Sequence, residues 1–133
     1  MSDNERRGGA ELLSGKRVLV VEDEFLIALD IQRILESAGV QTVELTSRVA
    51  QALDCIASKG AFDAAVLDLK LDRENSAPVA ERLQGDKVPF VFLTGGPSLS
   101  DVTKRFPQAP VVGKPFDGKE LLAALAKAVA SNG

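Results

Sequence analysis

Side chains that could take part in metal or phosphate chemistry stand at the ends of several short apolar segments. They are Glu22, Asp23, Asp68, Thr94 and Lys114. Each comes after a run of apolar residues, which is where a buried strand ends. In open α/β sheets the ligand site lies beyond the carboxyl ends of the strands, so we expect these side chains to converge.

The three carboxylates in this set predict a magnesium site. Like charges a few Å apart raise one another's pKa values, and a hard divalent cation with oxygen ligands relieves the repulsion. Mg²⁺ is the expected ion, because it needs only one or two carboxylates and keeps water or phosphate oxygens as its other ligands.

The chain contains no histidine and a single cysteine, Cys55. The lack of histidine excludes Ser-His-Asp and Cys-His nucleophile systems and His-containing zinc sites. One cysteine cannot form an internal disulfide, and its place in an apolar helical stripe indicates a buried, inert thiol. The chemistry must therefore use carboxylates, hydroxyls, lysine and a hard metal ion.

Length and charge narrow the class of protein further. The 133 residues fit one domain, which we divide into a disordered leader (residues 1–14) and a folded domain (residues 15–133). A formal net charge of −3 argues against nucleic-acid binding, which needs a basic patch. No apolar stretch approaches the roughly 20 residues of a membrane span, and no secretory signal is evident, so we expect a cytoplasmic protein.

The elements that must position these side chains are visible in the hydrophobic pattern. Continuous apolar runs predict strands covered on both faces at 18–21, 64–67, 88–93 and 111–112, with a weaker, alternating strand at 41–45. Apolar residues at helical spacing predict helices over 27–38, 49–56 and 121–129, and a further helix within 75–84. These ranges locate four helices, and the alternation of strand and helix, five of each, predicts a doubly wound α/β fold with a five-stranded parallel sheet of order 2-1-3-4-5.

Local signals predict where three of these helices begin or end. Gly39 is expected to cap the first helix at its C-terminus. Asp117 and Glu120 resemble a capping box at the start of the last helix. Pro78 must lie in the first turn of the third helix or before it.

Four motifs carry a family resemblance. In one-letter code they are VLVVEDE (residues 18–24), VLDL (66–69), FLTGG (92–96) and GKPF (113–116). In this order and spacing, over roughly residues 16–130, they closely resemble the receiver domains of two-component response regulators. The third motif also resembles the Phe-Ala-Thr-Gly-X-Tyr signature of single-domain receivers common in alphaproteobacteria, from which Leu93 and Pro97 depart.

The resemblance implies a flavodoxin-like receiver fold and assigns roles to the acidic residues. Asp68 matches the phosphoacceptor, and Glu22 and Asp23 match the acidic pair that holds Mg²⁺ directly or through water. The backbone carbonyl of Lys70 is expected to be a further metal ligand. The physical argument agrees, because phosphoryl transfer depends mainly on positioning and on neutralisation of charge on the phosphoryl oxygens.

The resemblance also assigns the remaining two side chains. Thr94 matches the hydroxyl that contacts the phosphoryl group, and Lys114 the lysine that pairs with it. Val111 occupies the position where most receivers have an aromatic residue that swings with the hydroxyl on activation, so Thr94 is expected to move without that partner.

These matches predict a stand-alone receiver, a phosphoprotein of signal transduction that accepts a phosphoryl group from a histidine kinase. Its output would be protein contact, phosphorelay to a histidine phosphotransfer protein, or drainage of phosphoryl groups from a shared kinase. Two alternatives stay open: a pseudo-receiver that binds partners without phosphorylation, and an aspartyl-nucleophile phosphatase of the haloacid dehalogenase type. The second fits poorly, because that family needs Asp-X-Asp and this chain has Asp68-Leu-Lys70.

Overall fold

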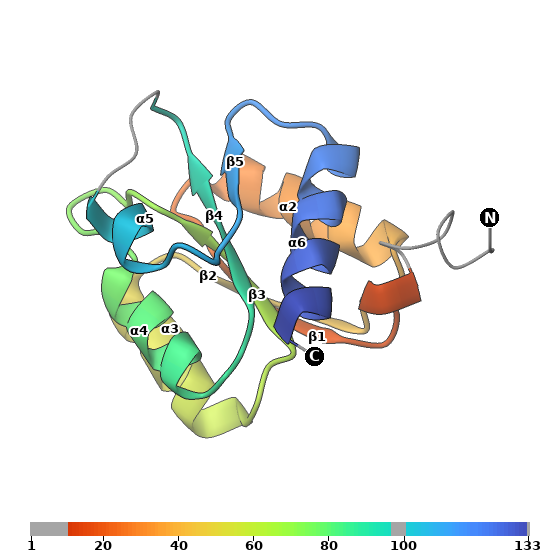
Figure 1. Cartoon of the computed structure of the whole chain (residues 1–133), viewed down its shortest axis with the longest axis horizontal. Helices are drawn as coiled ribbons and strands as arrows, with labels where there is room; N and C mark the ends of the chain where they lie inside the picture. Colours follow the sequence, from red (N-terminus) through yellow and green to blue (C-terminus); the bar gives the residue numbers. More distant parts are fainter. Residues whose placement is uncertain (1–10, 97–100, 133) are drawn as a thin grey trace.

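A five-stranded parallel sheet lies at the centre of the computed structural model, which describes residues 11–96 and 101–132 (Figure 1). Its order is β2-β1-β3-β4-β5, and every neighbouring pair is parallel. The strands are β1 (Arg17–Val21), β2 (Thr42–Thr46), β3 (Ala64–Asp68), β4 (Phe90–Thr94) and β5 (Val111–Gly113). The predicted fold class and strand order are confirmed.

Helices cover both faces of this sheet. One face carries α2 (Phe25–Ser37) and α6 (Gly118–Asn132), and the other carries α3 (Val49–Lys59), α4 (Ala77–Gly85) and α5 (Asp101–Arg105) (Figure 1). Each face has its own core of apolar side chains, which is why the central strands consist of continuous apolar residues. Every residue of β3 is buried, including Asp68 at its end.

The fourth strand begins later than its apolar run predicts, at Phe90 instead of residue 88. The amide of Val88 donates to the carbonyl of Leu83 and so closes the end of α4. Pro89 has no amide hydrogen to donate, although its carbonyl accepts a hydrogen bond from Ala65 of β3. An apolar run alone cannot show where such a turn ends and the strand begins.

The three local signals predicted at helix ends are confirmed. Gly39 has a φ of 87°, which favours glycine, and its amide donates to Glu36 at the end of α2. Pro78 lies in the first turn of α4. At the start of α6, the amide of Glu120 donates to Asp117 Oδ1 (2.8 Å) and the amide of Asp117 donates to Glu120 Oε1 (3.3 Å), which is a capping box.

The N-terminal boundary differs from the expectation of a disordered leader over residues 1–14. Residues 1–10 lie outside the described residues, but residues 11–13 form a helical turn. Leu13 is fully buried in the core beneath α2 and α6, and the amide of Gly15 donates to the carbonyl of Gly39. Burial of this one leucine ties residues 11–14 to the folded part of the chain, so the expectation is wrong for them.

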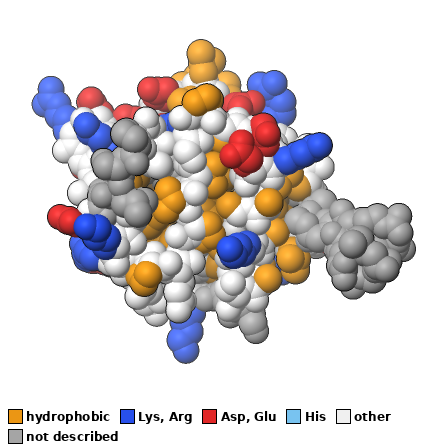
Figure 2. All heavy atoms as spheres, turned by 45° about the horizontal axis from the view of Figure 1, so that its top comes forward, with side chains coloured by type: hydrophobic (Ala, Val, Ile, Leu, Met, Phe, Trp, Pro, Cys, Tyr) orange, Lys and Arg blue, Asp and Glu red, His pale blue; other side chains and the backbone are white. Residues whose placement is uncertain are grey.

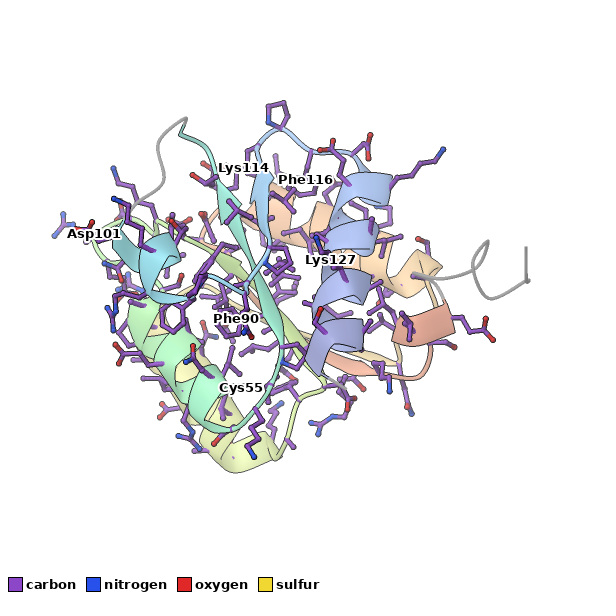
Figure 3. All side chains as sticks on the ribbon, in the orientation of Figure 1. Cys55, Phe90, Asp101, Lys114, Phe116 and Lys127 are labelled. Atoms are coloured by element: carbon purple, nitrogen blue, oxygen red, sulfur yellow. The ribbon has the colours of Figure 1, made fainter. Side chains whose placement is uncertain are left out.

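The face under α3, α4 and α5 contains an aromatic cluster that supports β4. The ring of Phe90 contacts those of Phe92 and Phe106 edge-on, with centroids 5.5 and 5.7 Å away. Cys55 of α3 is buried on the same face (Figure 3), and its desolvation raises the pKa of the thiol, as expected for an unreactive cysteine. Among the described residues, no helix has the length and apolar character that a membrane crossing requires.

Candidate functional site

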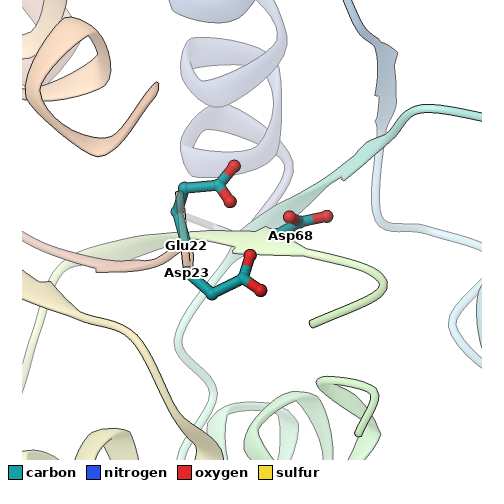
Figure 4. Close-up of side chains that lie close together, drawn as sticks. All are labelled: Glu22, Asp23 and Asp68. Atoms are coloured by element: carbon teal, nitrogen blue, oxygen red, sulfur yellow. The ribbon is translucent and has the colours of Figure 1, made fainter. Parts of the chain in front are cut away.

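Three carboxylates project from the carboxyl ends of two adjacent strands. Because β1 and β3 pair with Val21 opposite Leu67, the residues that end or follow these strands lie at the same edge of the sheet. Glu22, Asp23 and Asp68 each offer an oxygen, and these oxygens all lie within 4.8 Å of one another (Figure 4). The parallel register therefore brings Asp68 to two carboxylates that lie more than forty positions earlier in the sequence.

Two of the three carboxylates are buried. Glu22 is 2% exposed and Asp68 is 4% exposed, whereas Asp23 is exposed. A buried charge is costly unless it is paired and hydrogen-bonded. Asp23 faces solvent at the entrance, so the cluster has a charged opening and a desolvated floor.

Lys114 supplies the counter-charge for both buried carboxylates. Its ammonium donates to Glu22 Oε1 at 2.8 Å and to Asp68 Oδ2 at 2.9 Å. The side chain reaches the cluster from the end of β5 (Figure 3), where the Lys114 amide donates to the carbonyl of Thr94 and the Lys114–Pro115 peptide bond is cis. Lys114 is therefore part of the cluster and does more than form a turn with the following proline.

The protonation of this group follows from burial and contact. Burial raises the pKa of Glu22 to about 7, and the hydrogen bond to Asp68 adds to the rise, while Lys114 and the Glu24 amide act against it. Burial by itself would lower the pKa of Lys114, but its hydrogen bonds to Glu22 and Asp68 raise that pKa above its ordinary value. The lysine keeps its positive charge at neutral pH, and Glu22 exchanges a proton there.

Thr94 and Lys70 complete the set of residues that the sequence predicts. Both line one pocket of about 970 Å³ together with Asp23, Asp68 and Lys114. Thr94 is the last residue of β4, and its hydroxyl accepts a hydrogen bond from the Gly96 amide (3.2 Å). The Lys70 amide donates to Asp68 Oδ1 at 3.3 Å. The other five predicted residues thus lie around Asp68.

Sequence reasoning missed the structure of the loop that follows Asp68. Residues 70 and 75 form an antiparallel bridge, the Leu71 amide donates to the Glu74 carbonyl, and the Ser76 amide donates to the Leu69 carbonyl. We refer to residues 69–76 as the β3–α4 hairpin. Its residues form part of the pocket lining, and no spacing signal distinguishes them from an ordinary polar loop.

The charges on one face of the molecule are mixed. In the view of Figure 2, lysine and arginine side chains lie separately among acidic and apolar ones, without a continuous basic patch in the described part of this face. Proteins that bind a phosphate backbone concentrate basic residues on one face or stripe. This face lacks that electrostatic pattern.

Comparison with known proteins places this site in context. The family model described as "Response regulator receiver domain" matches residues 18–126. The transcriptional regulatory protein DltR of Streptococcus agalactiae serotype III (strain NEM316) is 33% identical over 111 residues, which cover 80% of this chain and 49% of DltR. The chain spans about half the length of such curated relatives.

Solved structures of similar size also match. The solution structure of SdrG from Sphingomonas melonis Fr1 is 40% identical with a TM-score of 0.74, and the match covers 89% of this chain and 98% of that one. The BeF3-activated conformation of SdrG from Pseudomonas melonis Fr1 is 39% identical with a TM-score of 0.71, covering 87% and 98% of the two chains.

Proposed function

Because the chain belongs to the response regulator receiver domain family, we propose that it accepts a phosphoryl group on Asp68 from a histidine kinase, in a reaction that requires Mg²⁺. The observation that carries this proposal is the position of the Lys114 ammonium, which contacts Asp68 and Glu22, while Lys114, Asp68 and Thr94 line the same pocket. A nucleophilic carboxylate, an ammonium and a hydroxyl are the groups that phosphoryl transfer needs.

The proposed step is a displacement at phosphorus. A carboxylate oxygen of Asp68 attacks, an O–P bond forms, and the P–N bond to the donor imidazole breaks, so that the electron pair stays on the imidazole nitrogen. Lys114 is close enough to Asp68 to neutralise charge on the transferred phosphoryl oxygens. The Thr94 hydroxyl can exchange its bond with Gly96 for one to a phosphoryl oxygen, because it is already in the pocket wall.

The acidic cluster fits the hard cation that the family uses. Its donors are carboxylate oxygens, which Mg²⁺ prefers, and three of them lie within 4.8 Å of one another. Glu22, Asp23, Asp68 and the backbone carbonyl of Lys70 would hold the ion. When bound, it would offset the repulsion between an anionic donor and the anionic Asp68.

We propose that the output is contact with another protein or relay to a histidine phosphotransfer protein, in the cytoplasm. The match to the SdrG chain over almost its whole length supports this, as does the mixed charge of the face in Figure 2. We expect no turnover of other substrates, only phosphorylation and dephosphorylation of the chain itself. By analogy with the BeF3-activated SdrG, beryllofluoride should occupy the same pocket.

Incubation with acetyl phosphate and Mg²⁺, followed by intact-mass spectrometry over time, tests the proposal. We expect one phosphoryl group per chain that decays slowly, and none in an Asp68→Asn variant. Rapid, repeated hydrolysis of phosphomonoesters would instead indicate a phosphatase. A wild-type protein that takes up no phosphoryl group would indicate a phosphorylation-independent interaction module.

A further inference from the structure

A carboxylate on the β3–α4 hairpin binds the start of a different helix. Glu74 Oε2 accepts a hydrogen bond from the backbone amide of Val49 at 2.9 Å, across 25 residues of sequence. Val49 is the first residue of α3, and this helix has neither a side-chain cap at Arg48 nor an acidic residue in its first turn. The amides at a helix N-terminus need hydrogen-bond acceptors and attract negative charge. Glu74 therefore provides the acceptor and the negative charge that α3 itself does not have at this end.

The same hairpin carries the backbone of Lys70 beside the phosphoacceptor. The Lys70 amide donates to Asp68 Oδ1, and Lys70 pairs across the hairpin with Asn75, the neighbour of Glu74. The Leu71 amide donates to the Glu74 carbonyl at 2.8 Å, so the backbone of Glu74 is tied to the residue that follows Lys70. A displacement of Glu74 would therefore move the peptide groups next to Asp68.

The base of the hairpin is held by other contacts. Leu69 and Leu71 are buried in the core, and the side-chain carbonyl of Asn75 accepts from the Ala77 amide at the start of α4. The four residues from Asp72 to Asn75 are exposed. Within the described part of the chain, Glu74 is the one residue of these four whose side chain hydrogen-bonds to a helix other than α4.

We infer that Glu74 is a positioning residue for the phosphoacceptor site: by binding the N-terminus of α3, it fixes the hairpin that presents the Lys70 backbone to Asp68 and to Mg²⁺. This inference rests on the proposed function, because it takes the Lys70 carbonyl as a metal ligand. Groups that orient a metal ligand usually change metal affinity by about 10- to 100-fold when they are removed.

Four variants separate positioning from charge. Glu74→Ala removes both the acceptor and a negative charge, whereas Glu74→Gln removes the charge and keeps an oxygen that can accept from Val49. Asp72→Ala removes a carboxylate from the same hairpin, and Asp72 makes no hydrogen bond with other described residues. Val49→Pro removes the donor instead, and proline is well tolerated at the first position of a helix. Arg48 has the extended backbone (φ −138°, ψ 155°) that a following proline requires.

In the experiment, each folded protein is titrated with Mg²⁺, and binding is monitored through the amide resonances of residues 68–70 in NMR spectra. Glu74→Ala and Val49→Pro should each weaken Mg²⁺ binding by about tenfold. The double variant should lose little more than either single variant, because both remove the same bond. The Mg²⁺ affinity of Glu74→Gln should stay within about threefold of the wild-type affinity. Asp72→Ala should weaken Mg²⁺ binding less than Glu74→Ala does, because it removes only a charge.

Hydrogen exchange supplies a second measurement in the same samples. The Val49 amide should be protected in the wild type and in Glu74→Gln, and it should exchange faster in Glu74→Ala. Wild-type affinity in both Glu74→Ala and Val49→Pro would overturn the inference and leave the proposed function standing. Equal losses in Glu74→Gln and Glu74→Ala would also overturn it, because they would assign the effect to charge. A wild-type protein that binds no Mg²⁺ would overturn the proposed function and the inference together.

Discussion

The ammonium of Lys114 lies 2.8 Å from a carboxylate oxygen of Glu22, although 92 residues separate the two in the sequence. The Glu22 side chain is fully buried, and the Lys114 side chain is 19% exposed. The same ammonium reaches Asp68 at 2.9 Å, so a single cation serves two buried carboxylates. This shared contact determines how the site responds to substitution, pH and metal.

Removal of the ammonium should destabilise the protein. Lys114→Met leaves Glu22 and Asp68 buried without their counter-charge, which should lower the free energy of unfolding by about 3 kcal/mol in urea titrations without metal. Lys59→Met is the matched control, because Lys59 pairs with Glu44 at an exposed site and should cost less than about 1 kcal/mol. Equal losses in the two variants would contradict the shared contact.

Stability of the metal-free protein should fall as pH rises from about 4.5 to about 7. Burial raises the pKa of Glu22 from 4.5 to about 7, so between these values the native state binds this proton and the unfolded chain does not. A carboxyl with a raised pKa stabilises the native state below its unfolded pKa, and that contribution is lost as pH rises through the folded pKa.

The measurement is urea unfolding of the wild type and of Glu22→Gln across this pH range. The difference between the two pH dependences should amount to a loss on the order of 3 kcal/mol in the wild type. Parallel pH profiles of the two proteins would show that Glu22 has an ordinary pKa.

Magnesium should raise the melting temperature, and more strongly at pH 8 than at pH 6. A ligand that binds only the native state stabilises it by mass action, by about 2.7 kcal/mol at 100 times its dissociation constant. Metal binding requires ionised carboxylates, and Glu22 holds a proton below about pH 7. Differential scanning calorimetry at the two pH values checks this, with Asp23→Asn as the variant that should lose most of the effect. A melting temperature that does not change when Mg²⁺ is added at pH 8 would count against a metal site.

The Thr94 hydroxyl should matter for activation and little for stability. Among the described residues it bonds only locally, accepting from the Gly96 amide at 3.2 Å and donating to the Gly96 carbonyl at 3.4 Å. Thr94→Val should unfold within about 1 kcal/mol of the wild type, because only exposed local bonds to Gly96 are lost. Beryllofluoride and Mg²⁺ should shift the NMR resonances around residue 94 in the wild type and in Thr94→Ser, but not in Thr94→Val. Identical NMR responses in the Val and Ser variants would show that the Thr94 hydroxyl is not needed for activation.

The sequence was most informative where a local pattern has only one structural outcome. Continuous apolar runs predicted the central strands, and the polar residues that end them predicted the edge where Glu22 and Asp68 lie. The capping box of Asp117 and Glu120 involves only residues close together in the chain, so the start of α6 could be predicted from the sequence.

Contacts between distant segments could not be predicted in this way. The bond from the Val49 amide to Glu74 joins a helix end to an irregular loop, and neither residue has a spacing signal. Burial of Leu13 likewise depends on the apolar core beneath α2 and α6, which exists only after these helices pack. Lys114 binds Glu22 as well as Asp68 because of the side-chain geometry of the cluster, which the sequence does not show.

The central claim is that Asp68 is the nucleophile of a pocket assembled from the ends of separate strands. The most direct test is to phosphorylate the protein with acetyl phosphate and Mg²⁺, reduce the acyl phosphate with borohydride, and locate the resulting homoserine by peptide mass spectrometry. We predict homoserine at position 68 and nowhere else, with no product from the Asp68→Asn protein. Homoserine at another acidic residue, or a phosphoryl group that survives in Asp68→Asn, would contradict the account.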